Sequence, residues 1–230
     1  MKRFIAVQHS YSEFLGSIEK QLENRGIGFS YFRPFTGQSL PASALQFDAL
    51  WLLGGAHAPA DRAQVPWLDE ELRLLRAFTA AHRPVIGLGF GALLLALAAG
   101  GEPQPDDGPY AYWTTAHATV AGAADPVAQA IDGRRVLVAA SGRVTLPEGI
   151  APLATDDDGR WILLRQGEAC GLLFRPEMTP GMIEDTIMEE GRPLPEDIGE
   201  VLARARELWP EFRETTDRVI AALVAELDLM

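Results

Sequence analysis

Cysteine and long apolar runs are the two features that this sequence has least of. Cys170 is the single cysteine among 230 residues, so no disulfide can form within the chain. The longest uncharged stretch, residues 84–101, is rich in glycine and falls short of the ~20 apolar residues that a membrane-spanning helix needs. Residues 1–7 resemble a short strand more than a secretion signal. The sequence therefore predicts a cytoplasmic protein without a membrane partner.

Positive charge is also scarce. The chain has 20 Lys and Arg against 32 Asp and Glu, a formal net charge of −12, and no basic cluster stands out. Because such a field repels a polyanion, nucleic acid is not expected as a partner. No group of His, Cys and Asp has metal-ligand spacing, and residues 156–159 lack the rest of a calcium loop and predict an acidic turn between strands. We expect no metal and no cofactor.

What the sequence does contain is enough apolar material for a large core. Hydrophobic residues make up 47% of the chain and charged residues 23%, which is ordinary globular usage and excludes disordered and fibrous classes. A length of 230 residues fits one large α/β unit, so we predict a single domain over 1–230.

The first ninety residues alternate between apolar strands and amphipathic helices. Strands are predicted at 4–7, 27–32, 48–53 and from 85, with helices after 14 and after 66. This alternation favours a doubly wound, mostly parallel sheet with helices on both faces.

The second half is less regular. Short runs predict an antiparallel extension of the sheet, at 118–121, 135–139, 161–164 and 169–174. Residues 191–195 form a linker candidate, and the segment 192–230 that includes them continues as a helical tail. One face of that tail is apolar, which predicts docking on the body of the domain.

The most informative segment is 84–96, in which an apolar strand runs through closely spaced glycines into a helix. Gly87 and Gly91 flank Gly89 in the Gly-x-X-x-Gly arrangement of a nucleophile elbow. The residue at the apex of such a turn is aimed into a pocket, together with backbone N–H groups from the start of the helix. Glycine there avoids the cost of a strained backbone, so the scaffold is expected to be kept.

Three stretches in this order resemble the class I glutamine amidotransferase family, especially members similar to the glutaminase part of GMP synthase. Residues 53–59 resemble its glycine-rich oxyanion loop, 87–92 its elbow and 171–177 its His-Pro-Glu segment. The resemblance implies the flavodoxin-like, three-layer fold of that family. It also implies ammonia release from glutamine for a partner synthetase.

The chain departs from the family pattern where the chemistry lies. The resemblance places the catalytic cysteine at Gly89, the histidine at Arg175 and the glutamate at Glu177, and it puts Leu93 where a substrate-holding glutamine is usual. Residues 140–142 replace a further histidine motif. Since glycine has no nucleophile and arginine accepts no proton, no catalytic residue and no glutaminase activity by the usual mechanism are expected.

Two interpretations of Arg175 stay open. Beside the N–H groups of Gly55 and Phe90, its guanidinium would suit a small carboxylate or phosphate ligand. Alternatively, it pairs with Glu177 and fills the cavity. His57, in the glycine-rich loop, and His9, after the first strand, are further pocket candidates.

Cys170 lies outside the elbow in an apolar strand, and the sequence favours a buried core residue over a nucleophile there. His82 and His117 show no partner pattern. The leading hypothesis is a non-hydrolysing pseudoenzyme that serves as a binding or partner subunit, for a synthetase or another protein. One alternative is an enzyme whose pocket uses Arg175 and Glu177 differently, and another is an essential half of a mixed complex.

Overall fold

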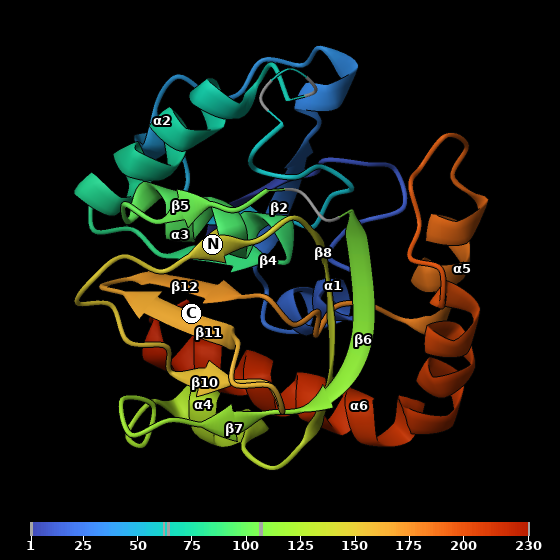
Figure 1. Cartoon of the computed structure of the whole chain (residues 1–230). Helices are drawn as coiled ribbons and strands as arrows, with labels where there is room; N and C mark the ends of the chain where they lie inside the picture. Colours follow the sequence, from blue (N-terminus) through green and yellow to red (C-terminus); the bar gives the residue numbers. More distant parts are fainter. Residues whose placement is uncertain (1, 62, 64, 106–107, 230) are drawn as a thin grey trace.

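The computed structural model describes residues 2–61, 63, 65–105 and 108–229, and its centre is an eight-stranded sheet (Figure 1). The strands, in their order across the sheet, are β2 (Gly28–Phe32), β1 (Arg3–Val7), β3 (Ala49–Leu52), β4 (Val85–Leu88), β12 (Ala169–Leu172), β11 (Trp161–Gln166), β10 (Ala154–Thr155) and β7 (His117–Ala118). The first five run parallel and the last three continue the sheet in antiparallel pairing. The predicted mostly parallel sheet with an antiparallel extension is confirmed.

Helices cover the sheet on both sides (Figure 1). Their bounds are α1 (Ser17–Glu23), α2 (Leu68–Ala80), α3 (Phe90–Ala98), α4 (Pro126–Ile131), α5 (Pro180–Met188) and α6 (Ile198–Glu226), with short 3-10 turns η1 (Pro34–Thr36) and η2 (Ala44–Gln46). α2 and α3 pack together on one side, whereas α6 packs against α1 and α4 on the other. Strands β1, β3, β4 and β12 are completely buried between these layers, apart from the first residue of β1, which explains their continuous apolar runs.

Strand pairing in the second half differs from the prediction. β8 (Arg135–Ser141) does not extend the main sheet: it pairs with β6 (Pro109–Thr115) in a separate antiparallel ribbon. β5 (Glu102–Pro103) and β9 (Val144–Thr145) form another small ribbon. The predicted strand at 118–121 ends at Ala118, because a turn follows in which Gly122 packs against the backbone of residue 153. The sequence pattern predicted β7, β8, β11 and β12, but it predicted neither β5, β6, β9 and β10 nor the partner of β8.

The C-terminal helix α6 packs on the domain through an apolar face. Phe212, Val219, Ile220, Leu223 and Val224 of α6 are buried, and they lie on one helical face. None of the helices in the part of the chain that the structure describes is long and apolar enough to cross a membrane.

Candidate functional site: an elbow closed by a buried ion cluster

A tight elbow joins β4 to α3, with Gly89 alone between them. Gly89 has φ +52° and ψ −110°, a conformation that a residue with a side chain adopts only at a cost. A Cβ on Gly91 would lie 2.1 Å from the carbonyl oxygen of Leu52, and one on Gly87 would lie 2.4 Å from the carbonyl oxygen of Gly91. Close contact between strand and helix backbones therefore requires both flanking glycines, and the elbow predicted from the sequence is present.

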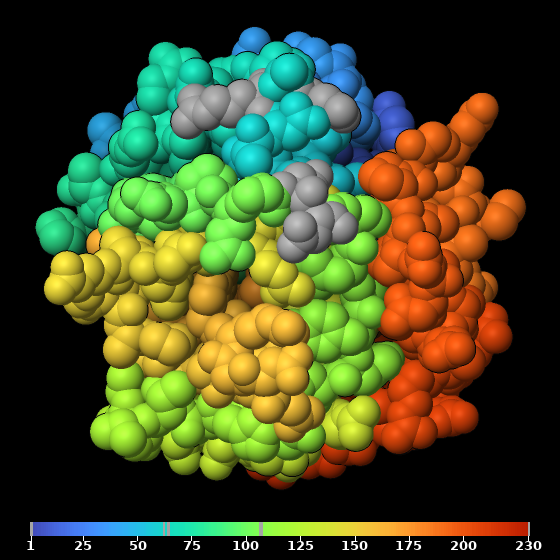
Figure 2. Space-filling view, viewed as in Figure 1, coloured from blue at the N-terminus to red at the C-terminus, as the bar shows by residue number. Residues whose placement is uncertain are grey.

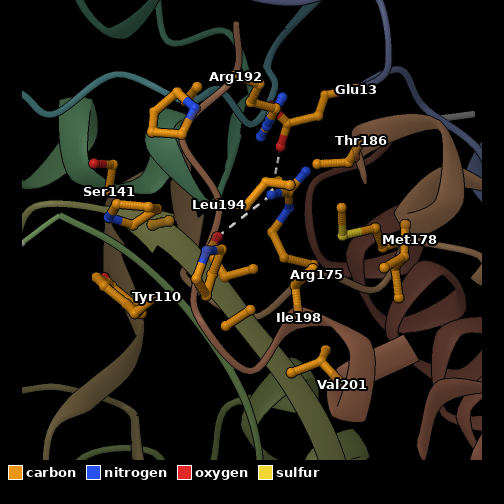
Figure 3. A pocket seen from close by; sticks show the side chains of 18 of the residues that line it. Glu13, Tyr110, Ser141, Arg175, Met178, Thr186, Arg192, Leu194, Ile198 and Val201 are labelled. Carbon is orange, nitrogen blue, oxygen red and sulfur yellow. Dashed lines mark hydrogen bonds and ion pairs between the residues drawn. The ribbon is translucent and has the colours of Figure 1, made fainter. Parts of the chain in front are cut away.

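Arg175 fills the space in front of the apex. A Cβ on Gly89 would lie 2.9 Å from Arg175 Cδ. The Arg175 residue is 1% exposed, and its guanidinium Nε lies 2.6 Å from Glu177 Oε1. Its Nη1 lies 2.8 Å from Glu13 Oε1 (Figure 3). Nη1 also donates to the carbonyl oxygen of Ala139 at 3.3 Å. Of the two sequence interpretations, the structure shows the one in which Arg175 pairs with Glu177 and fills the cavity.

The charges of this cluster compensate one another. Burial raises the pKa of the Glu13 carboxyl, but the attraction of Arg192 and Arg175 outweighs it and brings that pKa down to about 2. Burial likewise lowers the pKa of Arg175, and Glu177 and Glu13 more than restore it. Glu177 is the exception, because burial raises its pKa more than Arg175 lowers it. A guanidinium already bound to two carboxyl groups has little attraction left for an added anion.

The Glu13 ion pairs should make the free energy of unfolding depend on pH in the acid range. A folded pKa of about 2 against an ordinary 4.5 means that Glu13 stabilises the fold above pH 4.5 and loses that contribution as the pH falls toward 2. We expect the stability difference between wild type and Glu13→Gln to narrow by about 2 kcal/mol between pH 6 and pH 3 in urea titrations. The control Glu207→Gln, on the exposed face of α6, should run parallel to wild type; parallel curves for Glu13→Gln would contradict the assignment.

The predicted linker forms a roof over this site. Residues 189–197, here called the strap, join α5 to α6. Arg192 anchors the strap through Nη2, 2.9 Å from Glu13 Oε2, and through Nη1, 3.0 Å from Glu189 Oε2. Leu194 points into the space beside the ion cluster, which is reduced to a pocket of about 40 Å³ (Figure 3). The segment is therefore part of the site, through the partly buried Arg192 and Leu194, while its other side faces solvent.

His9 is a structural residue that links the first strand to the glycine-rich loop and to α2. It is buried, with Nε2 2.8 Å from Glu71 Oε1 and Nδ1 3.0 Å from the carbonyl oxygens of both Leu53 and Gly54. Both ring nitrogens face acceptors, which suits the imidazolium. Burial alone lowers the pKa of His9, and the Glu71 carboxylate reverses this so that the pKa is raised. The ring also packs edge-on against Phe90 at 5.0 Å. His9 thus holds the glycine-rich loop against the elbow.

The five predicted pocket residues do not converge on one cavity. Gly55 and Arg175 line the small pocket under the strap. Phe90 and Glu177 are completely buried and do not line it. His57 packs against Trp67 in a different, open pocket on the other side of the strap, and burial lowers its pKa. The expectation that His57 shares the Arg175 pocket is therefore wrong.

Three charged residues of the site were missed, of which Glu13 and Glu71 are buried and Arg192 is partly buried. Glu13, Glu71 and Arg192 meet partners 62 to 179 residues away in sequence. No local spacing marks such contacts, since each depends on where the chain returns to the same sheet edge. The sequence offers one signal for these residues, at Glu13. Its apolar neighbours Phe14 and Leu15 indicate that the carboxylate is buried and needs a partner.

The remaining candidates lie outside the site. Cys170 is completely buried in β12, and burial raises the pKa of its thiol to about 12, as fits a core residue. The acidic turn lies between β10 and β11 as predicted. His117 does have a partner, with Nε2 2.8 Å from Asp157 Oδ1. Within the described ranges, no three His, Cys, Asp or Glu residues are grouped so that they could hold a metal ion.

Comparisons with known proteins agree with this architecture. No family model matches the chain. The glutamine amidotransferase-like protein YfeJ of Salmonella typhimurium is 33% identical over 111 residues, which is 45% of this chain and 46% of that protein. The match thus spans about half the length of the curated relative.

Solved structures match over nearly the whole chain. A glutamine amidotransferase from Thermotoga maritima superposes with a TM-score of 0.79 at 19% identity, covering 96% of both chains. One from Methylobacillus flagellatus gives a TM-score of 0.83 at 21% identity, covering 99% of this chain and 96% of its own. The chain is therefore similar to glutamine amidotransferase-like proteins, and its fold is that of the class I glutamine amidotransferases.

Proposed function

We propose that this protein is a non-hydrolysing glutamine amidotransferase-like protein that acts as a binding or partner subunit in the cytoplasm. One observation carries the proposal: Arg175, paired with Glu13 and Glu177, occupies the space that a nucleophile and its base would need in front of Gly89. A glycine apex has no group that could attack an amide, and a buried guanidinium cannot accept a proton. Backbone N–H groups that could stabilise an oxyanion do not by themselves hydrolyse glutamine at an enzymatic rate.

The test is ammonia release from glutamine by the purified chain. Because loss of either member of a nucleophile–base unit costs several orders of magnitude, we expect no release above a protein-free control. Gly89→Cys combined with Arg175→His should remain inactive as well, since Glu13, Arg192 and the strap still close the pocket. Circular dichroism must show that this variant is folded. Ammonia release by the native chain would refute the proposal, and release by the double variant would show that only two side chains separate it from an enzyme.

The proposed partner role rests on the intact backbone structure of the elbow. Gly87, Gly91 and the His9–Glu71 pair keep the loop and helix in place although the apex has no reactive group. The alternative in which Arg175 and Glu177 run a different reaction is less well supported, because both are buried and bound to each other. Native mass spectrometry of the tagged chain from its own cells should show a stoichiometric protein complex. A chain isolated as a lone species would count against the subunit role.

A further inference from the structure

A second cleft opens on the face shown in Figure 2, beside the elbow and outside the strap. It appears there as a hollow between the green, yellow and orange segments. Its volume is about 510 Å³, which lies in the usual range for small-molecule sites. Leu93 and Leu173 form an apolar floor, and Tyr110, Arg143 and Trp161 stand around it.

The aromatic walls of this cleft are held in place by hydrogen bonds at their polar ends. Trp161 Nε1 donates to the carbonyl oxygen of Val144 at 2.8 Å. The hydroxyl of Tyr110 donates to the carbonyl oxygen of Gly142 at 3.2 Å. Both rings remain partly exposed and line the cleft. Rings that are fixed at their polar ends are suited to stack a planar ligand at a small entropic cost.

Arg143 supplies a positive charge at the rim. Its guanidinium lies 4.3 Å from the centroid of the Tyr110 ring. Among the residues that the structure describes, no carboxylate lies within 4.0 Å of it. Arg160, the other arginine of the cleft, is already paired with Asp158 at 2.6 Å and Asp156 at 3.8 Å. Within the described residues, Arg143 is thus a cation without an ion-pair partner, in a chain of net charge −12.

We propose that this cleft binds a planar aromatic ring that carries one anionic group, with the ring against Trp161 and Tyr110 and the anion on Arg143. A guanidinium stacked on a ring keeps its planar fork of donors available for a carboxylate or a phosphate. The apolar floor, where Leu93 offers no polar group, favours the body of the ring over an amide side chain. The proposal stands whether or not the elbow hydrolyses glutamine, because Arg143 and Trp161 line this cleft and not the Arg175 pocket under the strap.

Isothermal titration calorimetry tests the proposal with four probes: adenosine 5′-monophosphate, benzoate, adenosine and inorganic phosphate. We expect at least one of the two ring anions to bind with a Kd of about 100 µM or tighter. Adenosine, which has a ring but no anionic group, and inorganic phosphate, which has charge but no ring, should each bind at least about tenfold more weakly. Comparison of the first two probes shows whether a phosphate or a carboxylate is preferred.

Variants locate the site. Arg143→Gln should weaken binding of the ring anion by about tenfold or more, whereas Arg204→Gln, on the exposed face of α6, should leave it unchanged. The indole N–H signal of Trp161, assigned in NMR spectra with Trp161→Phe, should shift when the ring anion is added. Binding of neither ring anion below 1 mM (about −4 kcal/mol) would overturn the proposal. So would undiminished binding by Arg143→Gln, or an unmoved Trp161 signal at saturation.

Discussion

Arg175→Met is expected to lower the free energy of unfolding by about 3–5 kcal/mol. The substitution keeps most of the side-chain length but leaves two completely buried carboxyl groups, those of Glu13 and Glu177, without their shared cation. An uncompensated buried charge costs far more than the pair itself contributes, so the loss should exceed that of an ordinary core substitution. Arg175 would then be a structural residue that holds the elbow region together.

Urea unfolding at pH 7 measures this effect. The matched control is Arg204→Met, which removes an exposed pair with Glu207 and should cost no more than about 1 kcal/mol. Adding Glu177→Gln to Arg175→Met should recover part of the lost stability, because Glu177 loses its cation whereas Glu13 keeps its pair with Arg192. A loss below about 1 kcal/mol for Arg175→Met would mean that the carboxyl groups take up protons or water without cost, and the buried cluster would not stabilise the fold.

Gly91→Ala is expected to cost about 3 kcal/mol or more, and the protein then expresses mainly as unfolded or aggregated chain. The new methyl group would lie 2.1 Å from the carbonyl oxygen of Leu52 and 2.6 Å from its carbonyl carbon. These are backbone atoms of the buried strand β3, so no side-chain rotation relieves the contact. Either α3 moves away from the sheet or the elbow changes shape.

Thermal unfolding of Gly91→Ala and a matched glycine variant separates this effect from general helix propensity. Gly199 lies in the first turn of α6, where an added Cβ would meet open space and the backbone φ is not positive. Gly199→Ala should therefore raise stability by about 0.5–1 kcal/mol, as alanine does in a helix. If both variants behaved alike, the close approach of α3 to β3 would not be what requires glycine at position 91.

The strand and helix order of the first ninety residues, the elbow and the apolar face of α6 were determined by the sequence itself. Each depends on contacts within about fifteen residues, such as the Gly-x-Gly-x-Gly turn at 87–91, and such local patterns leave few alternatives. The sequence also determined that no nucleophile stands at Gly89. The sequence could not predict that β8 pairs with β6 and not with the main sheet. The residue alternation of β8 fits either partner equally well.

Only the tertiary structure decided what Arg175 does and where free charge lies. Arg175 meets Glu13 across 162 positions of chain, and the strap closes over both only because α5 and α6 return to the same sheet edge. The same folding leaves Arg143 without a described carboxylate partner beside Tyr110. Whether an arginine is neutralised or available depends on distances of a few ångströms between distant segments, since Coulomb attraction in a buried site falls steeply with separation and exposure. A sequence records the charges, and the fold decides which of them are paired.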